Sequence, residues 1–376
     1  MSQSFRAYRG IRPIINPVSR LRDDMKVTEL VDAWVTARNP APKTAYATRR
    51  IVRRFVSLLG DIGIGEINHT HLFDFRDALA VMPRNLTRFE RTASFRLLAA
   101  RFMDINDPRP KVAPTTVGKQ LNALQSLFGY AYSERWIRDD DVHNIPVNGH
   151  TPFQRRPFTK EEVTQLFSTS LFIRPWASTP ERRHIVSNET VRWLMFLGLM
   201  TGARLEELGQ LHVADIQTQH GIFYIEISET VYGGKADKSI KSPSSKRQVP
   251  IHQRLIDLGF LRFVRQRRLG GQLRLFPELE RDGYDRYTND ASRRCNRVID
   301  RVSRDPALVF HSFRHLFKDL CRTAGILECI NDQLTGHLPV TVGARYGRGA
   351  DLFALDEAIR SVDVEFVAWE PILRAA

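Results

Sequence analysis

The stretch from His311 to Tyr346 constrains this chain most, because its polar side chains follow a spacing that suits chemistry on a phosphate group. It contains the pattern H-x-x-R, then a Gly-His pair, and then a tyrosine nine residues after the histidine of that pair. Arginines can grip a phosphate with paired hydrogen bonds, and a tyrosine oxygen can attack it. The candidate members are Arg204, in TGARLEELGQL far upstream, and His311, Arg314, His337 and Tyr346.

This ordered set resembles the catalytic motif of the tyrosine recombinases, the phage-integrase and Xer-type site-specific recombinases. Members of that family carry an arginine in a TG-x-R context, then H-x-x-R, then Gly-His, then a tyrosine nine residues further on. Every element occurs here in the same order, and the resemblance extends over roughly residues 25 to 350, more strongly in the second half. H-x-x-R alone is common by chance, whereas the ordered set is specific.

The resemblance implies a mainly α-helical chain with a small antiparallel β-sheet in its C-terminal domain, built as a two-domain clamp on DNA. Local patterns agree: helical periodicity starts at Val27, Thr70 is expected to cap a third helix, and Thr159 and Glu162 form a capping box. GIFYIEISE and the segment 247–251 predict two strands joined by a turn-rich link. We expect a basic lead-in (1–24), a helical core-DNA-binding domain (25–138), a linker (139–158), a catalytic domain (159–350) and a C-terminal tail (351–376).

Basic residues follow one face of the helix predicted over 43–59. Arg49, Arg50, Arg53 and Arg54 lie away from the apolar stripe of that helix. Such a pattern suits a helix that lies along a phosphate backbone, and an ordinary solvated face is the equal alternative for any one of them.

The composition favours a nucleic-acid partner and gives no sign of a membrane one. A formal net charge of +14 and a pI of about 10.0 point to a polyanion, with a merely solvated basic surface as the alternative. The three cysteines form no C-x-x-C pair, so neither a disulfide framework nor a zinc knuckle is expected. The N-terminus lacks a signal-peptide core, and the longest apolar run, Trp193–Met200, is too short to span a bilayer. We therefore expect a cytoplasmic, nucleoid-associated protein.

The chemistry of phosphodiester attack explains why these residue types suit the site. Negative charge builds on the non-bridging oxygens, and Arg204 and Arg314 suit a clamp that stabilises it without a metal or nucleotide cofactor. The resemblance makes Tyr346 the nucleophile, which would form a 3′-phosphotyrosyl ester. That ester keeps the energy of the broken bond, so rejoining needs no ATP.

The leaving 5′ oxygen needs a general acid, and histidines suit the other proton movements. In the family the acid is a lysine on a turn between two strands, eight or nine residues before the proline of a Val-Pro pair. Lys241 fits this position best, and Lys238 and Lys246 are alternatives. His311 and His337 are expected to hydrogen-bond the scissile phosphate and help to move protons.

Two further residues match the family pattern near the arginines. Glu207, one turn after Arg204, resembles the acidic residue that holds the active-site groups in place, with a surface carboxylate as the alternative. His315 matches the second histidine of H-x-x-R-H. His311 and His315 also have the i, i+4 spacing of zinc ligands, but position 312 is Ser and no third ligand stands out, so no metal is expected.

These motifs predict an integrase-like site-specific recombinase that acts on double-stranded DNA through a Holliday junction. The resemblance implies a homotetramer on recombining sites, a monomer or dimer when free, and accessory directionality or DNA-bending proteins as further candidate partners. Type IB topoisomerase-like relaxation and a DNA-binding regulator with an inactive site are the alternatives. The apolar tail can dock on its own domain or, by family precedent, on a neighbouring protomer. The DNA target and the choice among phage integration, mobile-island transfer and chromosome-dimer resolution stay open.

Overall fold

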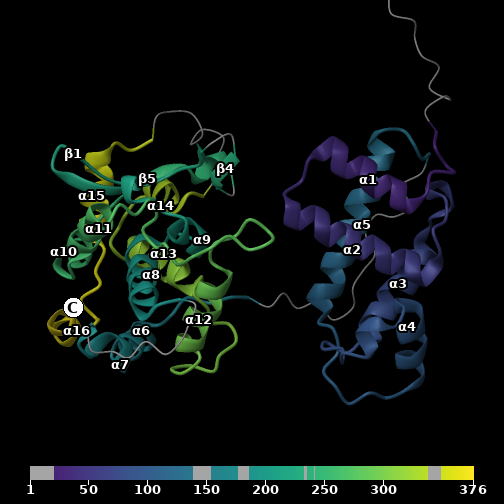
Figure 1. The fold of residues 1–376 in the computed structure, drawn as a ribbon, viewed down its shortest axis with the longest axis horizontal. Helices are drawn as coiled ribbons and strands as arrows, with labels where there is room; N and C mark the ends of the chain where they lie inside the picture. Colours follow the sequence, from purple (N-terminus) through teal and green to yellow (C-terminus); the bar gives the residue numbers. More distant parts are fainter. Residues whose placement is uncertain (1–20, 139–153, 177–185, 233–234, 241, 338–348) are drawn as a thin grey trace, which may run out of the picture. The chain divides into compact units, whose positions relative to one another are not determined.

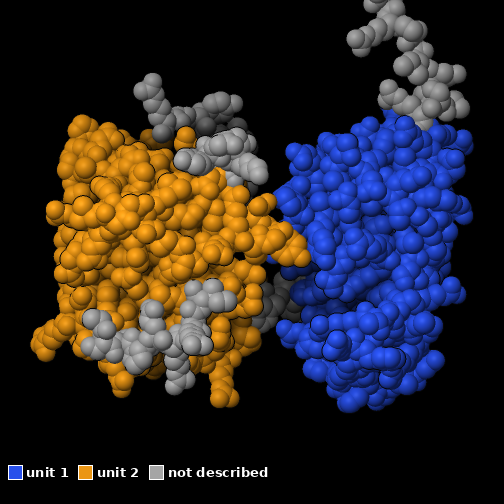
Figure 2. Space-filling model, viewed as in Figure 1, with its two compact units in different colours: residues 1–153 blue, residues 154–376 orange. Residues whose placement is uncertain are grey.

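The computed structural model describes residues 21–138, 154–176, 186–232, 235–240, 242–337 and 349–376. These residues are mainly helical, with one three-stranded antiparallel sheet and a separate two-stranded hairpin, which confirms the predicted fold class. The chain divides into two compact units, Met1–Phe153 and Gln154–Ala376 (Figure 2). No helix in the described ranges is both long and apolar enough to cross a membrane.

The first unit is helical throughout its described part (Figure 1). Its α-helices are α1 (Val27–Arg38), α2 (Pro42–Leu59), α3 (His69–Val81), α4 (Phe95–Asp104) and α5 (Pro114–Ser133), with 3-10 turns at Ile64–Glu66 and Glu90–Thr92. Phe55 of α2 and Phe75 of α3 are fully buried and meet edge to face, with ring centroids 5.4 Å apart. Burial of such apolar faces holds the bundle together.

The N-terminus of α3 differs from the sequence-based expectation. Asn68, not Thr70, is the cap: its side-chain oxygen accepts hydrogen bonds from the backbone N–H groups of Thr70 and His71 at 3.0 and 3.4 Å. The Thr70 prediction was wrong because Thr70 already lies inside the first helical turn, where its N–H needs an acceptor. By contrast, the Thr159–Glu162 capping box is confirmed, with reciprocal bonds of 2.9 and 3.1 Å.

The second unit combines helices with the two small β-structures (Figure 1). Its helices are α6 (Lys160–Phe167), α7 (Ser170–Ile173), α8 (Asn188–Thr201), α9 (Leu205–Gly209), α10 (Gln253–Asp257), α11 (Phe260–Leu269), α12 (Asn289–Ile299), α13 (Ser312–Thr323), α14 (Glu328–Thr335), α15 (Leu352–Ser361) and α16 (Trp369–Ala375), with 3-10 turns at Val213–Asp215 and Pro243–Ser245. Strands β1 (Ile216–Gln219), β2 (Ile222–Ile227) and β5 (Arg247–Pro250) form the sheet in the order β1-β2-β5. The link predicted between the two strands contains a hairpin of β3 (Thr230–Tyr232) and β4 (Lys235–Lys238).

Close packing of α8 against α13 fixes the frame of the second unit. Every residue of α8 from Asn188 to Thr201 is buried except Glu189. A Cβ on Gly198 would lie 2.7 Å from the ring of Phe310, and one on Gly202 would lie 2.5 Å from the ring of Phe317. Gly202 also has φ +60, which favours glycine at the end of a helix. The turn after α8 is therefore pressed against α13, with little freedom.

The C-terminal tail packs on its own unit in this single chain. Leu355, Ile359 and Trp369 are buried in the same apolar core as α8. Thr164 donates a hydrogen bond of 2.7 Å to the carbonyl of Phe366, and α16 lies against α7 (Figure 1). The tail therefore docks on its own domain here, not on a neighbouring protomer, which was the other arrangement that the sequence left open.

Candidate active site

Arg314 lies in the first turn of α13 and is 2% exposed. Its guanidinium donates to the carbonyl of Gly202 at 2.9 Å, and a second nitrogen lies 3.1 Å from Nε2 of His337. Burial, followed by the nearby charges of Arg204 and Arg247, lowers the pKa of Arg314 to about 9. Within the described part of the chain no carboxylate forms a direct ion pair with Arg314, and the more distant charges of Glu207 and Asp332 only partly offset the lowering of its pKa.

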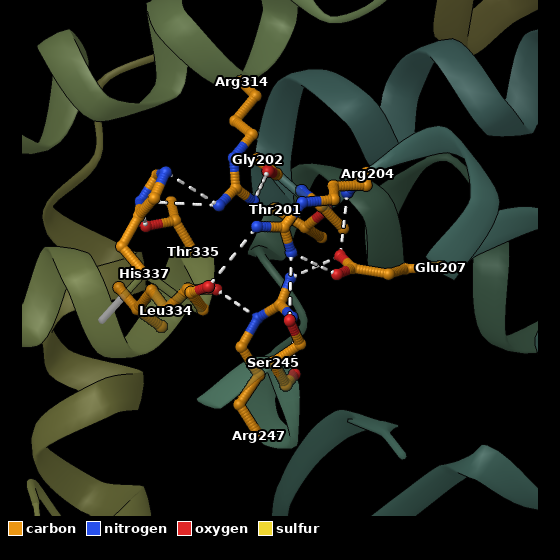
Figure 3. A network of polar contacts seen from close by, with 12 residues as sticks. Thr201, Gly202, Arg204, Glu207, Ser245, Arg247, Arg314, Leu334, Thr335 and His337 are labelled. Carbon is orange, nitrogen blue, oxygen red and sulfur yellow. Dashed lines mark hydrogen bonds and ion pairs between the residues drawn. The ribbon is translucent and has the colours of Figure 1, made fainter. Parts of the chain in front are cut away.

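Arg204 begins α9 directly after the turn that Gly202 makes possible. Its guanidinium donates to Glu207 Oε1 at 2.6 Å and to Ser245 Oγ at 3.2 Å. Figure 3 shows the guanidinium groups of Arg204 and Arg314 close together, the first from the start of α9 and the second from α13. The fold thus unites two arginines that are far apart in the sequence.

Glu207 is the carboxylate that joins two arginines of this cluster. It accepts from Arg204 and, at 2.8 Å, from Arg247 of β5. Burial opposes its ionisation, but the charges and hydrogen bonds of Arg247 and Arg204 outweigh burial and hold the pKa of Glu207 below its ordinary value. One carboxylate therefore orients two guanidinium groups.

Arg247 was missed by the sequence analysis, which treated it only as a strand residue. It is 5% exposed and also donates to the carbonyls of Leu334 at 2.7 Å and Ser245 at 2.8 Å. A Cβ on Gly336 would lie 2.8 Å from a guanidinium nitrogen of Arg247, and Gly336 has φ +67. Glycine therefore lets the turn before His337 pass close to Arg247, which ties β5 to the end of α14.

The hydrogen bonds of Thr335 assign the tautomer of His337 (Figure 3). The Thr335 hydroxyl donates its one proton to the carbonyl of Asn331 at 2.6 Å, so it accepts from Nδ1–H of His337 at 2.9 Å. The lone pair of Nε2 then faces Arg314. Burial, Arg314 and then Lys318 lower the pKa of His337 to about 4, so the ring is neutral near pH 7.

Lys318 is a further residue that sequence reasoning missed. Its ammonium lies 2.8 Å from Asp332 Oδ1 and 3.4 Å from Nδ1 of His337. It occupies α13 one turn after Arg314, on the side that faces α14. Lys318 occupies none of the motif positions. A lysine one turn along a helix from another residue is usually solvated, so its position in the sequence offered no reason to select it.

The first two histidines of the motif lie together at the start of α13. His311 precedes the helix and is exposed, and its ring meets that of His315 at 5.1 Å between centroids. Burial, and then the charge of Arg314, lowers the pKa of His315. No group of three or more histidine, cysteine or acidic residues suited to a metal occurs among the residues that the structure describes.

The lysine and tyrosine candidates are only partly placed. Lys241 and Tyr346 lie outside the described residues. Lys238 is 2% exposed, and its ammonium pairs with Asp215 at 2.6 Å. Lys246 is exposed.

The four arginines of α2 have different surroundings in the first unit. Arg49 pairs with Asp32 at 2.9 Å, and Arg54 donates to Gln120 at 3.0 Å. Arg50 and Arg53 are exposed. They are therefore not one uniform basic stripe.

Comparisons with known proteins show the family and the fold to which this chain is similar. The model of the phage integrase family matches residues 158–346, and a search of curated proteins finds no match. A Tn1549 transposon integrase in complex with circular intermediate DNA shares 16% identity over 88% of this chain and 97% of that chain, with a TM-score of 0.56. A lambda integrase tetramer bound to a Holliday junction shares 14% identity over 89% of this chain and 84% of that chain, with a TM-score of 0.50. At these identities the likeness is one of fold. Because the family model spans just over half of the 376 residues, the chain belongs to the phage integrase family of tyrosine recombinases.

Proposed function

We propose that this chain is a site-specific recombinase that cleaves and rejoins double-stranded DNA through a 3′-phosphotyrosyl intermediate. The observation that supports this most is the buried guanidinium of Arg314, which has no carboxylate partner among the described residues and lies beside Arg204 (Figure 3). A buried cation that no carboxylate contacts directly is costly, so such a site favours an anion. The charge that builds on a scissile phosphate is an anion of the required kind.

In the proposed cleavage step the phenolic oxygen of Tyr346 attacks phosphorus and the bond from phosphorus to the 5′ oxygen breaks. The phenolic proton passes to a histidine, His311 or His337, and the leaving 5′ oxygen takes a proton from a lysine. Arg204 and Arg314 stabilise the phosphoryl oxygens in the transition state. Attack by a 5′-hydroxyl group on the phosphotyrosyl ester reverses these bond changes and frees the tyrosine.

Lys241 is our candidate for the lysine acid. Lys238 is the weaker alternative, because its ammonium is buried against Asp215. Lys246 is exposed and remains the other alternative. A lysine that donates a proton needs access to the leaving oxygen, which the buried ion pair of Lys238 does not offer.

The proposed partners are double-stranded DNA and further copies of this chain. The Tn1549 integrase was solved with circular intermediate DNA, and the lambda integrase as a tetramer on a Holliday junction, which supports the same assembly here. Monomers or dimers in the free state, accessory directionality or DNA-bending proteins, and a nucleoid location belong to the same proposal. Docking of the tail on a neighbouring protomer would require it to leave the core that it fills in the single chain.

A nicked suicide substrate tests the chemistry. The nick lets the short 5′ fragment diffuse away, so the protein stays joined to the DNA and migrates as an adduct in a denaturing gel. We expect the adduct with the wild-type protein and none with Tyr346→Phe, which still shifts DNA in a native gel. A protein that shifts DNA without any adduct would be the regulator with an inactive site. Relaxation of supercoiled plasmid lacking a target site would favour the topoisomerase alternative.

A further inference from the structure

A pocket of about 340 Å³ lies within the first unit, between α2 and the chain that joins α3 to α4. This volume falls at the low end of the range for small-ligand sites, roughly 300–1,000 Å³. Apolar side chains, among them Leu79, Met82 and Phe95, form part of its wall. Four arginines also line the pocket: Arg50, Arg54, Arg84 and Arg91.

Some arginines of the first unit pair with a carboxylate, whereas others, including those of the pocket, do not. Elsewhere in the unit ion pairs of 2.7 to 2.9 Å are formed by Arg49 with Asp32, Arg76 with Asp77 and Arg109 with Glu90. Over residues 21–138 no ion pair joins a carboxylate to any of the four pocket arginines. Four like charges thus surround one hollow, where Arg54 donates to Gln120 and Arg91 donates to the carbonyl of Leu86 at 3.1 Å, but no carboxylate of residues 21–138 pairs with them.

Arg54 shows most clearly what it costs to hold several cations at this pocket. It is half-buried, one nitrogen donates to Gln120 at 3.0 Å, and its guanidinium carbon lies 6.0 Å from the centroid of the Phe95 ring. Burial, and then the charge of Arg50, lowers the pKa of Arg54. An anion in the pocket would offset both the burial of Arg54 and the repulsion from Arg50, because it attracts both guanidinium groups beside a partly apolar wall.

We propose that this pocket binds one phosphate group of a nucleotide, with the attached sugar against the apolar wall. Guanidinium groups match tetrahedral phosphate oxygens with paired hydrogen bonds, and a phosphate offers more acceptor oxygens to several arginines than a carboxylate does. The assignment keeps Arg50 and Arg54 from the basic face of α2, adds Arg84 and Arg91, and leaves out Arg49. The phosphate has two candidate sources, the backbone of bound DNA, which rests on the proposed function, and a free nucleotide.

The DNA arm of the test measures how affinity depends on salt. Fluorescence anisotropy of a fluorescein-labelled duplex with the full chain, over about 50 to 200 mM salt, gives the slope of log K against log salt. The pocket variant Arg50→Gln/Arg84→Gln changes two exposed residues. The matched control Arg76→Gln/Arg101→Gln removes the same charge from two arginines that do not line the pocket. We expect the slope to become shallower by about 1 in the pocket variant and to stay unchanged in the control.

The free-nucleotide arm uses AMP as the probe, without DNA. Isothermal titration calorimetry of the full chain with AMP, and with adenosine as the ligand that lacks a phosphate, reports binding directly. If a free nucleotide is the source, the wild-type protein and the control variant bind AMP, the pocket variant does not, and adenosine binds to none of them.

The two arms separate the sources and can overturn the proposal. A slope change specific to the pocket variant assigns a backbone phosphate of DNA, and AMP binding lost in that variant assigns a free nucleotide. If the pocket and control variants give equal slopes and AMP does not bind, the pocket holds no phosphate. Neither arm needs strand cleavage. Adduct formation on the suicide substrate therefore distinguishes a failure of this proposal from a failure of the proposed recombinase activity.

Discussion

Glu207→Gln tests the electrostatics of the candidate active site most sharply. Glu207 is 4% exposed and is the carboxylate that pairs with both Arg204, at 2.6 Å, and Arg247, at 2.8 Å. Glutamine keeps the size of the side chain but removes the charge. Arg204 and Arg247 would then lose the carboxylate with which both pair, and Arg314 would lose the nearby negative charge of Glu207.

The expected magnitude follows from how deeply each pair is buried. In the pair with Arg247 the side chains are 2% and 3% exposed, whereas the side chain of Arg204 is 21% exposed, so the Arg247 pair dominates. Removing one partner of a buried ion pair costs about 3–5 kcal/mol. We therefore expect the free energy of opening of the second unit to fall by about that amount, which accelerates amide exchange roughly a hundred- to several-thousand-fold.

Hydrogen–deuterium exchange with mass spectrometry on the full chain measures this effect in peptides from α8 and β5. The control is Glu370→Gln, which breaks an exposed i, i+4 pair with Arg374 and should cost no more than about 0.5 kcal/mol. Because the pKa of Glu207 is held below its ordinary value, the stability that its carboxylate contributes is present at neutral pH and is lost as pH falls through that lowered pKa. A loss below about 1 kcal/mol, similar to the control, would refute the role of Glu207 as the central counter-charge.

Further predictions concern His337 and the tail. Nitrogen-15 NMR without DNA should find His337 neutral at pH 6 with its proton on Nδ1; a pKa at or above its ordinary value would contradict this. Since the folded state resists protonation of this ring, its contribution to stability should decline as pH falls from about 6.5 toward 4. Thr335→Val, which removes the acceptor of that proton, should shift the tautomer equilibrium toward Nε2–H, whereas Thr335→Ser should preserve Nδ1–H. Trp369→Ala should destabilise the second unit by about 3–5 kcal/mol in urea unfolding, whereas Leu269→Ala, at a site 78% exposed, should change it by about 0.5 kcal/mol or less.

The order and spacing of short motifs in the sequence were sufficient to select the residue types that phosphodiester chemistry would need. Arg204, Arg314 and His337 stand in short ordered motifs, and the structure brings them into one network, with Glu207 beside Arg204 and His337 beside Arg314 (Figure 3). The mainly helical fold with a small antiparallel sheet followed from periodicity and from the family resemblance. Such signals are local, or are carried by the motif itself, so a single sequence contains them.

Other features depend on tertiary contacts that no local pattern encodes. Arg247 alternates within a strand like any other residue, and only the packing of β5 against α14 shows that it binds Glu207 and the Leu334 carbonyl. Lys318 looks like a solvated helical lysine until α14 places Asp332 beside it. The strands β3 and β4 occur in a glycine-containing segment that resembles a link, because two short strands of three and four residues leave little periodicity to detect.

Localising the covalent bond between protein and DNA tests the central claim most directly. After reaction with a suicide substrate, digestion with trypsin and nuclease and mass spectrometry would identify the peptide that carries a nucleotide. The proposed mechanism predicts a 3′-phosphate linked to the phenolic oxygen of Tyr346, with little or none formed by Arg314→Ala. A nucleotide on any other residue, or linkage through a 5′-phosphate, would contradict it.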